Sequence, residues 1–124
     1  MKKTILSVLL VMFVLFFSIV FVNFYFSSLC GNTIIKEIVS PNRNLKVVMF
    51  KRDCGATTGF STQLSIIDAS DNMGNESGNV YIVDGLSNKH DVKWIDDSTI
   101  SIQVGEGEIY KKLTTFKKVK IIYE

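Results

Sequence analysis

The stretch Arg52–Gln63, RDCGATTGFSTQ, gathers many of the side chains in this chain that could do chemistry. It holds a thiol, a guanidinium, a carboxylate and several hydroxyls, interrupted by two glycines. Such groups in a glycine-containing loop can bind a ligand, or they can satisfy the backbone of the loop itself. We therefore consider a binding loop whose contacting side chains are Arg52, Asp53, Thr57, Thr58, Ser61 and Thr62.

A catalytic use of this stretch would need a base beside its cysteine, Cys54. The chain has one histidine, His90, followed by Asp91. A thiol nucleophile requires that pair to meet in the fold, and nothing in the spacing demands it. A phosphate-binding P-loop is excluded, because Gly55 and Gly59 stand too close together. The sequence therefore predicts no catalytic residues, with a thiol-dependent redox protein or enzyme using Cys54 as the alternative.

Metal and cofactor motifs are equally weak. Two cysteines and one histidine do not provide the spacing of a zinc site. The acidic segment that begins at Asp68 places Met73 and Asn79 where a calcium-binding EF-hand has glycine and glutamate. A looser calcium site could use Asp68, Asp71 and Glu76, but a flexible polar turn explains the same residues. We expect neither a metal nor a cofactor.

The amino-terminal segment is apolar without interruption by charge. Residues 5–26 read ILSVLLVMFVLFFSIVFVNFYF. A helix of this length rises about 33 Å, enough to cross a hydrocarbon core of about 30 Å. The apolar centre of a cleaved signal peptide has only about 7–15 residues. We therefore expect an uncleaved signal anchor over residues 5–26, between a cytoplasmic end at 1–4 and a juxtamembrane segment at 27–32. Cleavage, and lipidation of Cys30 as in a lipoprotein, remain the alternatives; Leu29 stands where a lipoprotein has a small residue.

The charges predict the orientation of this segment. Lys2 and Lys3 precede it, and basic residues tend to stay in the cytoplasm. The localisation expected is the cell membrane, with one crossing and the C-terminal domain outside the cytoplasm. Because the chain has 14 basic and 12 acidic residues, the part beyond these two lysines is balanced at 12 each. Nucleic acid is therefore not an expected partner. The lipid bilayer is, together with an envelope protein or a cell-wall polymer.

The two cysteines fit an exported domain. Outside the cytoplasm Cys30 and Cys54 could form a disulfide. In the chain-entropy model, a closed loop of about 25 residues contributes about 3.5 kcal/mol. The alternatives are two unpaired thiols, or a lipidated Cys30 with Cys54 free.

Residues 33–124 read as short strands separated by turns. Leu45–Arg52 is apolar on both parities, which is typical of a central strand covered on both faces. The large core residues expected are Phe50, Phe60, Trp94 and Phe116. The fold class expected is all-β, a single small antiparallel sheet or sandwich. The strands expected are 33–39, 45–52, 61–68, 79–84, 92–95, 99–104, 108–113 and the terminal KKVKIIYE.

Three segments resemble a small bacterial family of unknown function: SPNRNLKVVMFKRDCGATTGFSTQLSI, GNVYIVDG and VKWIDDSTISI. Its members look like secreted or membrane-anchored proteins, and RDCGATTGFSTQ is the specific part of the match. The family turn SPdGk reads Ser40-Pro41-Asn42-Arg43-Asn44 here, so its glycine is missing. The resemblance implies no activity. The function expected is thus a non-catalytic envelope binding or interaction module that displays Arg52–Gln63.

Overall fold

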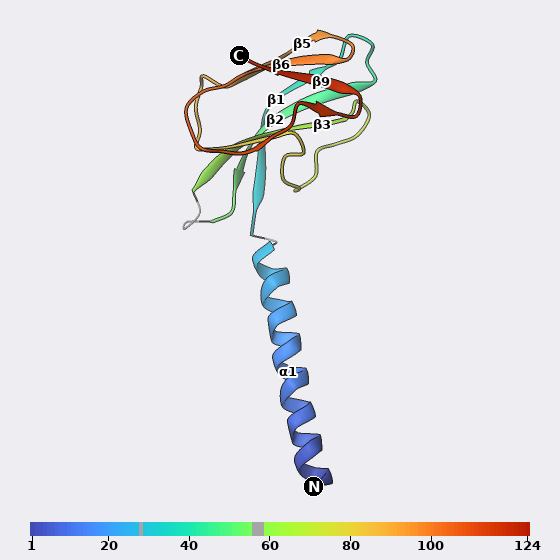
Figure 1. Ribbon diagram of the computed structural model, residues 1–124, viewed down its shortest axis with the longest axis vertical. Coiled ribbons are helices and arrows are strands. Elements are labelled where there is room, and N and C mark those ends of the chain that lie inside the picture. The colour runs from blue at the N-terminus through green and yellow to red at the C-terminus, as the bar shows by residue number, and fades with distance from the viewer. Residues whose placement is uncertain (28, 56–58) are drawn as a thin grey trace. The chain divides into compact units, whose positions relative to one another are not determined.

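The computed structural model describes residues 1–27, 29–55 and 59–124, without the side chains of residues 26 and 27 (Figure 1). The chain divides into two compact units, residues 1–30 and 31–124. Each unit is described by itself.

The first unit is the helix α1, Lys2–Ser27. Two polar side chains within the apolar run bond back to the helix itself: Ser18 Oγ donates to the carbonyl of Val14 and Asn23 Nδ2 to that of Ile19, each at 2.8 Å. Their hydrogen-bonding groups are thus partly satisfied inside the helix, as a lipid surrounding requires. Lys2–Tyr25 is long and apolar enough to cross a membrane, a test that a signal sequence would also pass.

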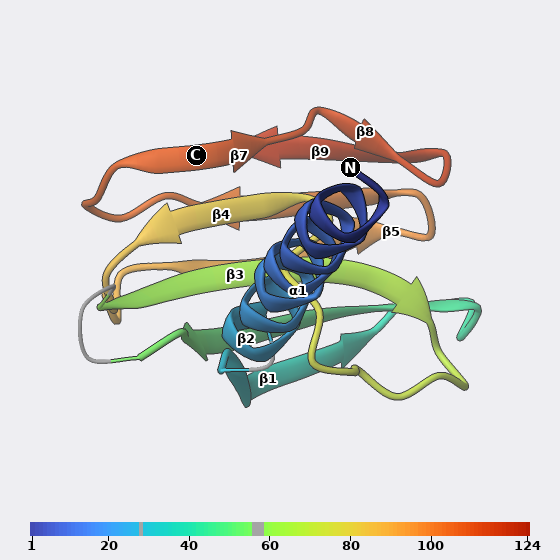
Figure 2. The same cartoon turned by 90° about the horizontal axis from the view of Figure 1, so that it is seen from below.

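The second unit consists of two β-sheets, which confirms the all-β fold class (Figure 2). The first sheet is antiparallel, in the order β1 (Gly31–Val39), β2 (Leu45–Asp53), β3 (Phe60–Asp68), β4 (Tyr81–Asp84) and β7 (Ile109–Lys112). The second has the order β5 (Asp91–Asp96), β6 (Thr99–Gln103), β9 (Val119–Tyr123) and β8 (Thr115–Phe116). The sequence did not indicate that β6 and β9 would pair in parallel. After β6 the chain forms β7 in the first sheet and then returns to the second sheet, where β9 runs parallel to β6.

The core lies between the two sheets. In β2, Val47 and Met49 belong to the main cluster of core residues, which includes Ile100 and Ile102 of the second sheet. Val48 and Phe50 are also fully buried, and strand alternation places them on the opposite face of β2. The prediction of a central strand covered on both faces is therefore confirmed for β2.

The prediction of large core residues is only partly right. Phe50 is fully buried, and Trp94 and Phe116 pack partly buried against the core. For Phe60 the prediction is wrong. Its side chain is 45% exposed, because it starts β3 at the end of the sheet. The largest fully buried side chain is Tyr81, which the pattern did not single out.

The outer face of the first sheet is bonded to residues 69–80. The sequence suggested a flexible polar turn followed by a strand from 79, but β4 begins only at Tyr81. The Asn79 side chain bonds to both backbone groups of Ile66. Its Oδ1 accepts from the Ile66 N–H at 2.8 Å, and its Nδ2 donates to the Ile66 carbonyl at 2.9 Å. Gly78 N–H donates to Gln63 Oε1, and Asn79 N–H donates to Ser65 Oγ. The end of this segment, at Gly78 and Asn79, is therefore bonded into the sheet.

The turn between β1 and β2 keeps the backbone that a glycine would favour. Arg43 has a φ of 63°, the left-handed region. It occupies the position at which the resemblance leads us to expect a glycine. The turn conformation is therefore accessible without the glycine, and the Ser40 hydroxyl helps to fix it by accepting a hydrogen bond from Leu45 N–H at 3.1 Å.

Candidate functional site

The charged side chains of the predicted binding loop make structural contacts. Arg52 Nη1 donates to Asn32 Oδ1 at 2.8 Å and to the carbonyl of Asn75 at 2.9 Å, which joins β1 and β2 to the segment 69–80. Asp53 Oδ1 accepts from Gly55 N–H at 3.0 Å, as in an Asx turn. Both side chains are thus engaged in shaping the hairpin.

The hydroxyl side chains of that loop divide into three groups. Ser61 Oγ accepts from Gln63 Nε2 at 2.8 Å on the outer face. Thr62 is buried, and its hydroxyl donates to the carbonyl of Gly85 at 2.8 Å. Thr57 and Thr58 lie outside the described residues, so their part in a binding loop stays a prediction.

Cys30 and Cys54 form a disulfide. It lies one position beyond the last register pair of β1 and β2, Gly31 with Asp53. In this state Cys54 has no thiolate to attack a substrate, and Cys30 has no thiol to carry a lipid. The disulfide therefore argues against both alternatives that rest on a free cysteine.

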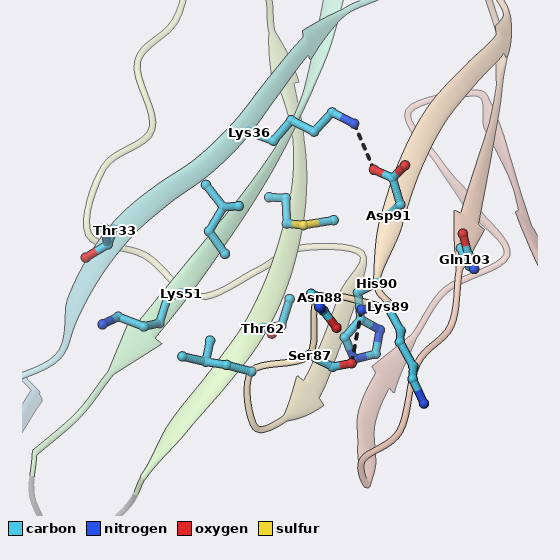
Figure 3. Close-up of a pocket in the computed structure, with 13 residues that line it drawn as sticks. Thr33, Lys36, Lys51, Thr62, Ser87, Asn88, Lys89, His90, Asp91 and Gln103 are labelled. Atoms are coloured by element: carbon cyan, nitrogen blue, oxygen red, sulfur yellow. Dashed lines mark hydrogen bonds and ion pairs between the residues drawn. The ribbon is translucent and has the colours of Figure 1, made fainter.

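A groove of about 670 Å³ lies within the β domain, between the first sheet and the connection from β4 to β5 (Figure 3). One side is the face of β1, β2 and β3 that alternation turns toward the core, and the other is residues 86–90 with the start of β5. Of the predicted loop residues in the described part of the chain, Thr62 alone lines it. The lining residues are Thr33, Ile35, Lys36, Met49, Lys51, Thr62, Leu86, Ser87, Asn88, Lys89, His90, Asp91 and Gln103.

A β-bulge in β1 explains why successive residues of that strand reach the groove. Thr33 pairs with Lys51 and Ile34 with Phe50, but Lys36 pairs with Met49, so Ile35 is the extra residue. A bulge shifts the alternation of a strand and re-aims its side chains. Ile35 and Lys36 therefore both line the groove, beyond which Ile38 packs against the core.

His90 is a buried polar residue of the groove wall. It is 5% exposed, and its Nδ1 accepts from the backbone N–H of Gly105 at 2.9 Å. An accepting Nδ1 assigns the proton of the neutral ring to Nε2. Among the described residues Nε2 has no acceptor, and the nearby hydroxyl of Tyr81 has no partner either. The two rings are 6.2 Å apart at their centroids. A side chain at Gly105 would approach Nε2 to 3.1 Å, so glycine allows this close contact.

Three lysines and one carboxylate line the groove. Lys36 of β1 forms an ion pair at 2.8 Å with Asp91 at the start of β5, linking the two sheets (Figure 3). Lys89 pairs with the strongly exposed Glu106 at 3.0 Å. In the described part of the chain no carboxylate lies within 4.0 Å of Lys51. Its ammonium rests over the Phe60 ring, 4.6 Å from the centroid.

The Lys36–Asp91 pair makes stability depend on pH. The hydrogen bond from Lys36, aided by one from Val92 N–H, lowers the pKa of Asp91 below its ordinary value of 3.8. A lowered pKa contributes stability that is complete above that ordinary value and is lost as pH falls through the folded pKa. The pair is half exposed, so we expect a loss of only about 0.2–1 kcal/mol. Urea unfolding of wild type and Lys36→Met between pH 6 and 3 should show the difference shrinking at low pH; a constant difference would contradict this role.

Metal ligands do not cluster among the described residues, where no group of three or more His, Cys, Asp or Glu side chains could hold an ion. Of the residues considered for calcium, Asp68 instead lies 3.4 Å from Lys117 as an ion pair.

The sequence did not identify the connection GLSNKHD as a binding wall. It marked His90 only as a base for Cys54. Two signals were present in the sequence: a lone histidine, His90, within a polar connection, and a lysine, Lys51, at the end of an apolar strand. Neither becomes a site until the bulge and the second sheet place them on opposite sides of one groove.

The chain is similar to one described protein family over most of its length. The model of a family of unknown function, DUF5412, matches residues 1–118. The expected resemblance to such a family is confirmed to that extent. No curated protein and no solved structure matches the chain.

Proposed function

The chain belongs to the DUF5412 family of unknown function, and we propose that it is a membrane-anchored, non-catalytic binding module whose β domain binds its ligand in the groove. The observation that supports this proposal is the groove. Its volume of about 670 Å³ falls among small-molecule sites, which span about 300–1,000 Å³. Its lining is mainly polar, with Ile35, Met49 and Leu86 as apolar members. Much of the lining stands on strands, which hold a site more firmly than loops do.

The proposed location is the outer side of the cell membrane. The apolar amino-terminal helix and the disulfide suggest the secretory pathway. We propose further that α1 is retained as an anchor in the lipid bilayer, with Lys2 and Lys3 in the cytoplasm. The ligand then comes from this side of the membrane: a bilayer lipid, an envelope protein, a cell-wall polymer or a small molecule.

Binding is favoured over catalysis by how the reactive groups are used. Cys54 is oxidised in the disulfide, and Nδ1 of His90 already accepts from Gly105. Neither is prepared as a thiolate or a general base at this site. The apolar floor of the groove consists of Ile35, Met49 and Leu86. Hydroxyl, amide and ammonium groups that line the groove beside this floor are suited to holding a ligand in place.

Site-specific cross-linking tests the groove as the ligand site. We propose to incorporate a photoreactive amino acid at Asn88, an exposed groove residue, in the full-length protein expressed in its native envelope. The matched control is Asn72, an exposed asparagine outside the lining. We expect a defined adduct at position 88 and none at 72. Equal yields at both positions, or no adduct at 88, would contradict a ligand site in the groove.

A further inference from the structure

We infer that the groove is a site for an organic anion, in which Lys51 neutralises a phosphate or carboxylate group and the apolar floor holds the body of the ligand. This inference deepens the proposed function and rests on it. It follows from the charges, the hydrogen-bond donors and the apolar residues of the lining.

The charges of the lining favour a negative ligand. Three ammonium groups and one carboxylate line the groove, and that carboxylate, Asp91, is already paired with Lys36. The partner of Lys89 is Glu106, whose side chain is 86% exposed, and such surface pairs are weak. Among the described residues, the Lys51 ammonium contacts the face of Phe60 and no carboxylate. A cation over an aromatic ring is held less strongly than one paired with an anion.

The position of Lys51 suits anion binding. It lies between Thr33 and Thr62 in one row across three neighbouring strands. The Thr62 hydroxyl is used to hold Gly85, which fixes the start of the opposite wall. Thr33 is exposed and lines the groove beside Lys51, so its hydroxyl can donate to a bound anion.

The polar groups of the opposite wall are mainly donors. Ser87 Oγ accepts from Lys89 N–H at 3.1 Å, which leaves its own hydroxyl proton to donate. The ammonium group of Lys89, whose partner Glu106 is strongly exposed, is a further donor on this wall. These donors favour a ligand rich in acceptor oxygens. Phosphate and carboxylate groups are the strongest such acceptors.

The apolar floor distinguishes an organic anion from a bare inorganic one. Ile35 and Leu86 line the groove at 55% and 51% exposure, and Met49 is buried beneath. Apolar area of this kind is stabilised when a hydrocarbon or sugar-ring body covers it. The ligand therefore combines an anionic group with a body of several carbons. Both an anionic lipid headgroup and a soluble metabolite carry this chemistry.

Titration of the full-length protein in a non-ionic detergent tests the inference. The probes are hexyl phosphate, hexanoate, inorganic phosphate and the neutral hexanol, followed through backbone amide shifts of residues 86–91 in NMR spectra. Phosphatidylglycerol and phosphatidylcholine vesicles, with the protein in nanodiscs, form a second arm. Lys51→Met removes the charge and keeps most of the stem; Lys120→Met, at an exposed lysine outside the lining, is the matched control.

We expect hexyl phosphate or hexanoate to bind more tightly than either hexanol or inorganic phosphate. Loss of a charge-assisted contact in Lys51→Met should weaken that binding roughly tenfold or more, and Lys120→Met should leave it unchanged.

Binding of phosphatidylglycerol alone would assign the anion to a lipid, and binding of the short probes alone to a soluble ligand. Equal binding of hexanol and the anions, or equal loss in both variants, would overturn the inference while leaving a ligand groove. Absence of anion binding would also overturn it, and cross-linking at position 88 would then decide the proposed function separately.

Discussion

Replacing both Cys30 and Cys54 with alanine is expected to lower the free energy of unfolding of the β domain by about 3 kcal/mol. The disulfide closes a loop of about 25 residues, for which chain entropy gives about 3.5 kcal/mol. It also lies at the end of the β1–β2 ladder, where Gly31 pairs with Asp53. Its loss should therefore let that end of the hairpin open more readily than the middle.

Urea unfolding of the full-length protein in detergent measures this effect. Trp94 is the single tryptophan, and its Nε1 donates to the Ile38 carbonyl at 2.9 Å between the two sheets, so its fluorescence reports the β domain. A reducing agent should shift the wild-type midpoint to that of the double variant and should leave the variant unchanged. A wild-type midpoint insensitive to reduction would contradict a stabilising disulfide.

Replacing Asn79 with alanine is expected to cost about 2–4 kcal/mol. Its side-chain amide pairs with both the N–H and the C=O of Ile66, in the place of a neighbouring strand. Alanine would leave two backbone groups of β3 without these partners, and each unsatisfied buried group costs about 1–3 kcal/mol. The change should loosen the whole segment 69–80 from the first sheet.

Asn72→Ala is the matched control, because this exposed asparagine belongs to the same segment. It should change the unfolding free energy by less than about 0.5 kcal/mol. Hydrogen exchange should show faster exchange at Ile66 and Gly78 in Asn79→Ala only. If both variants had the same midpoint, segment 69–80 would not be the structural cover described here.

The sequence predicted those features that depend on local pattern. An uninterrupted apolar run indicated the helix, and alternation with turn residues indicated nearly all the strands. Five consecutive buried residues, from Lys46 to Phe50, followed from a strand apolar on both parities. The disulfide followed from compartment and an even count of cysteines.

Features that depend on contacts distant in sequence were not predictable. Segment 69–80 is polar, so it resembles a solvated loop until Gln63 and Ser65 supply its partners across the sheet. Phe60 is a large aromatic residue of the kind that fills protein cores, but its position at the start of β3 leaves its side chain outside the core. The groove needs a bulge at Ile35, an ion pair between sheets and a glycine that admits His90, and none of these has a sequence signature by itself.

The measurement that tests the account most directly is cross-linking at Asn88 in intact cells, followed by protease added from outside. We predict a groove adduct that external protease removes together with the β domain, while α1 stays in the membrane fraction. An adduct protected from protease until the cells are lysed, or a position 88 that captures no ligand in the native envelope, would contradict an outward-facing binding module.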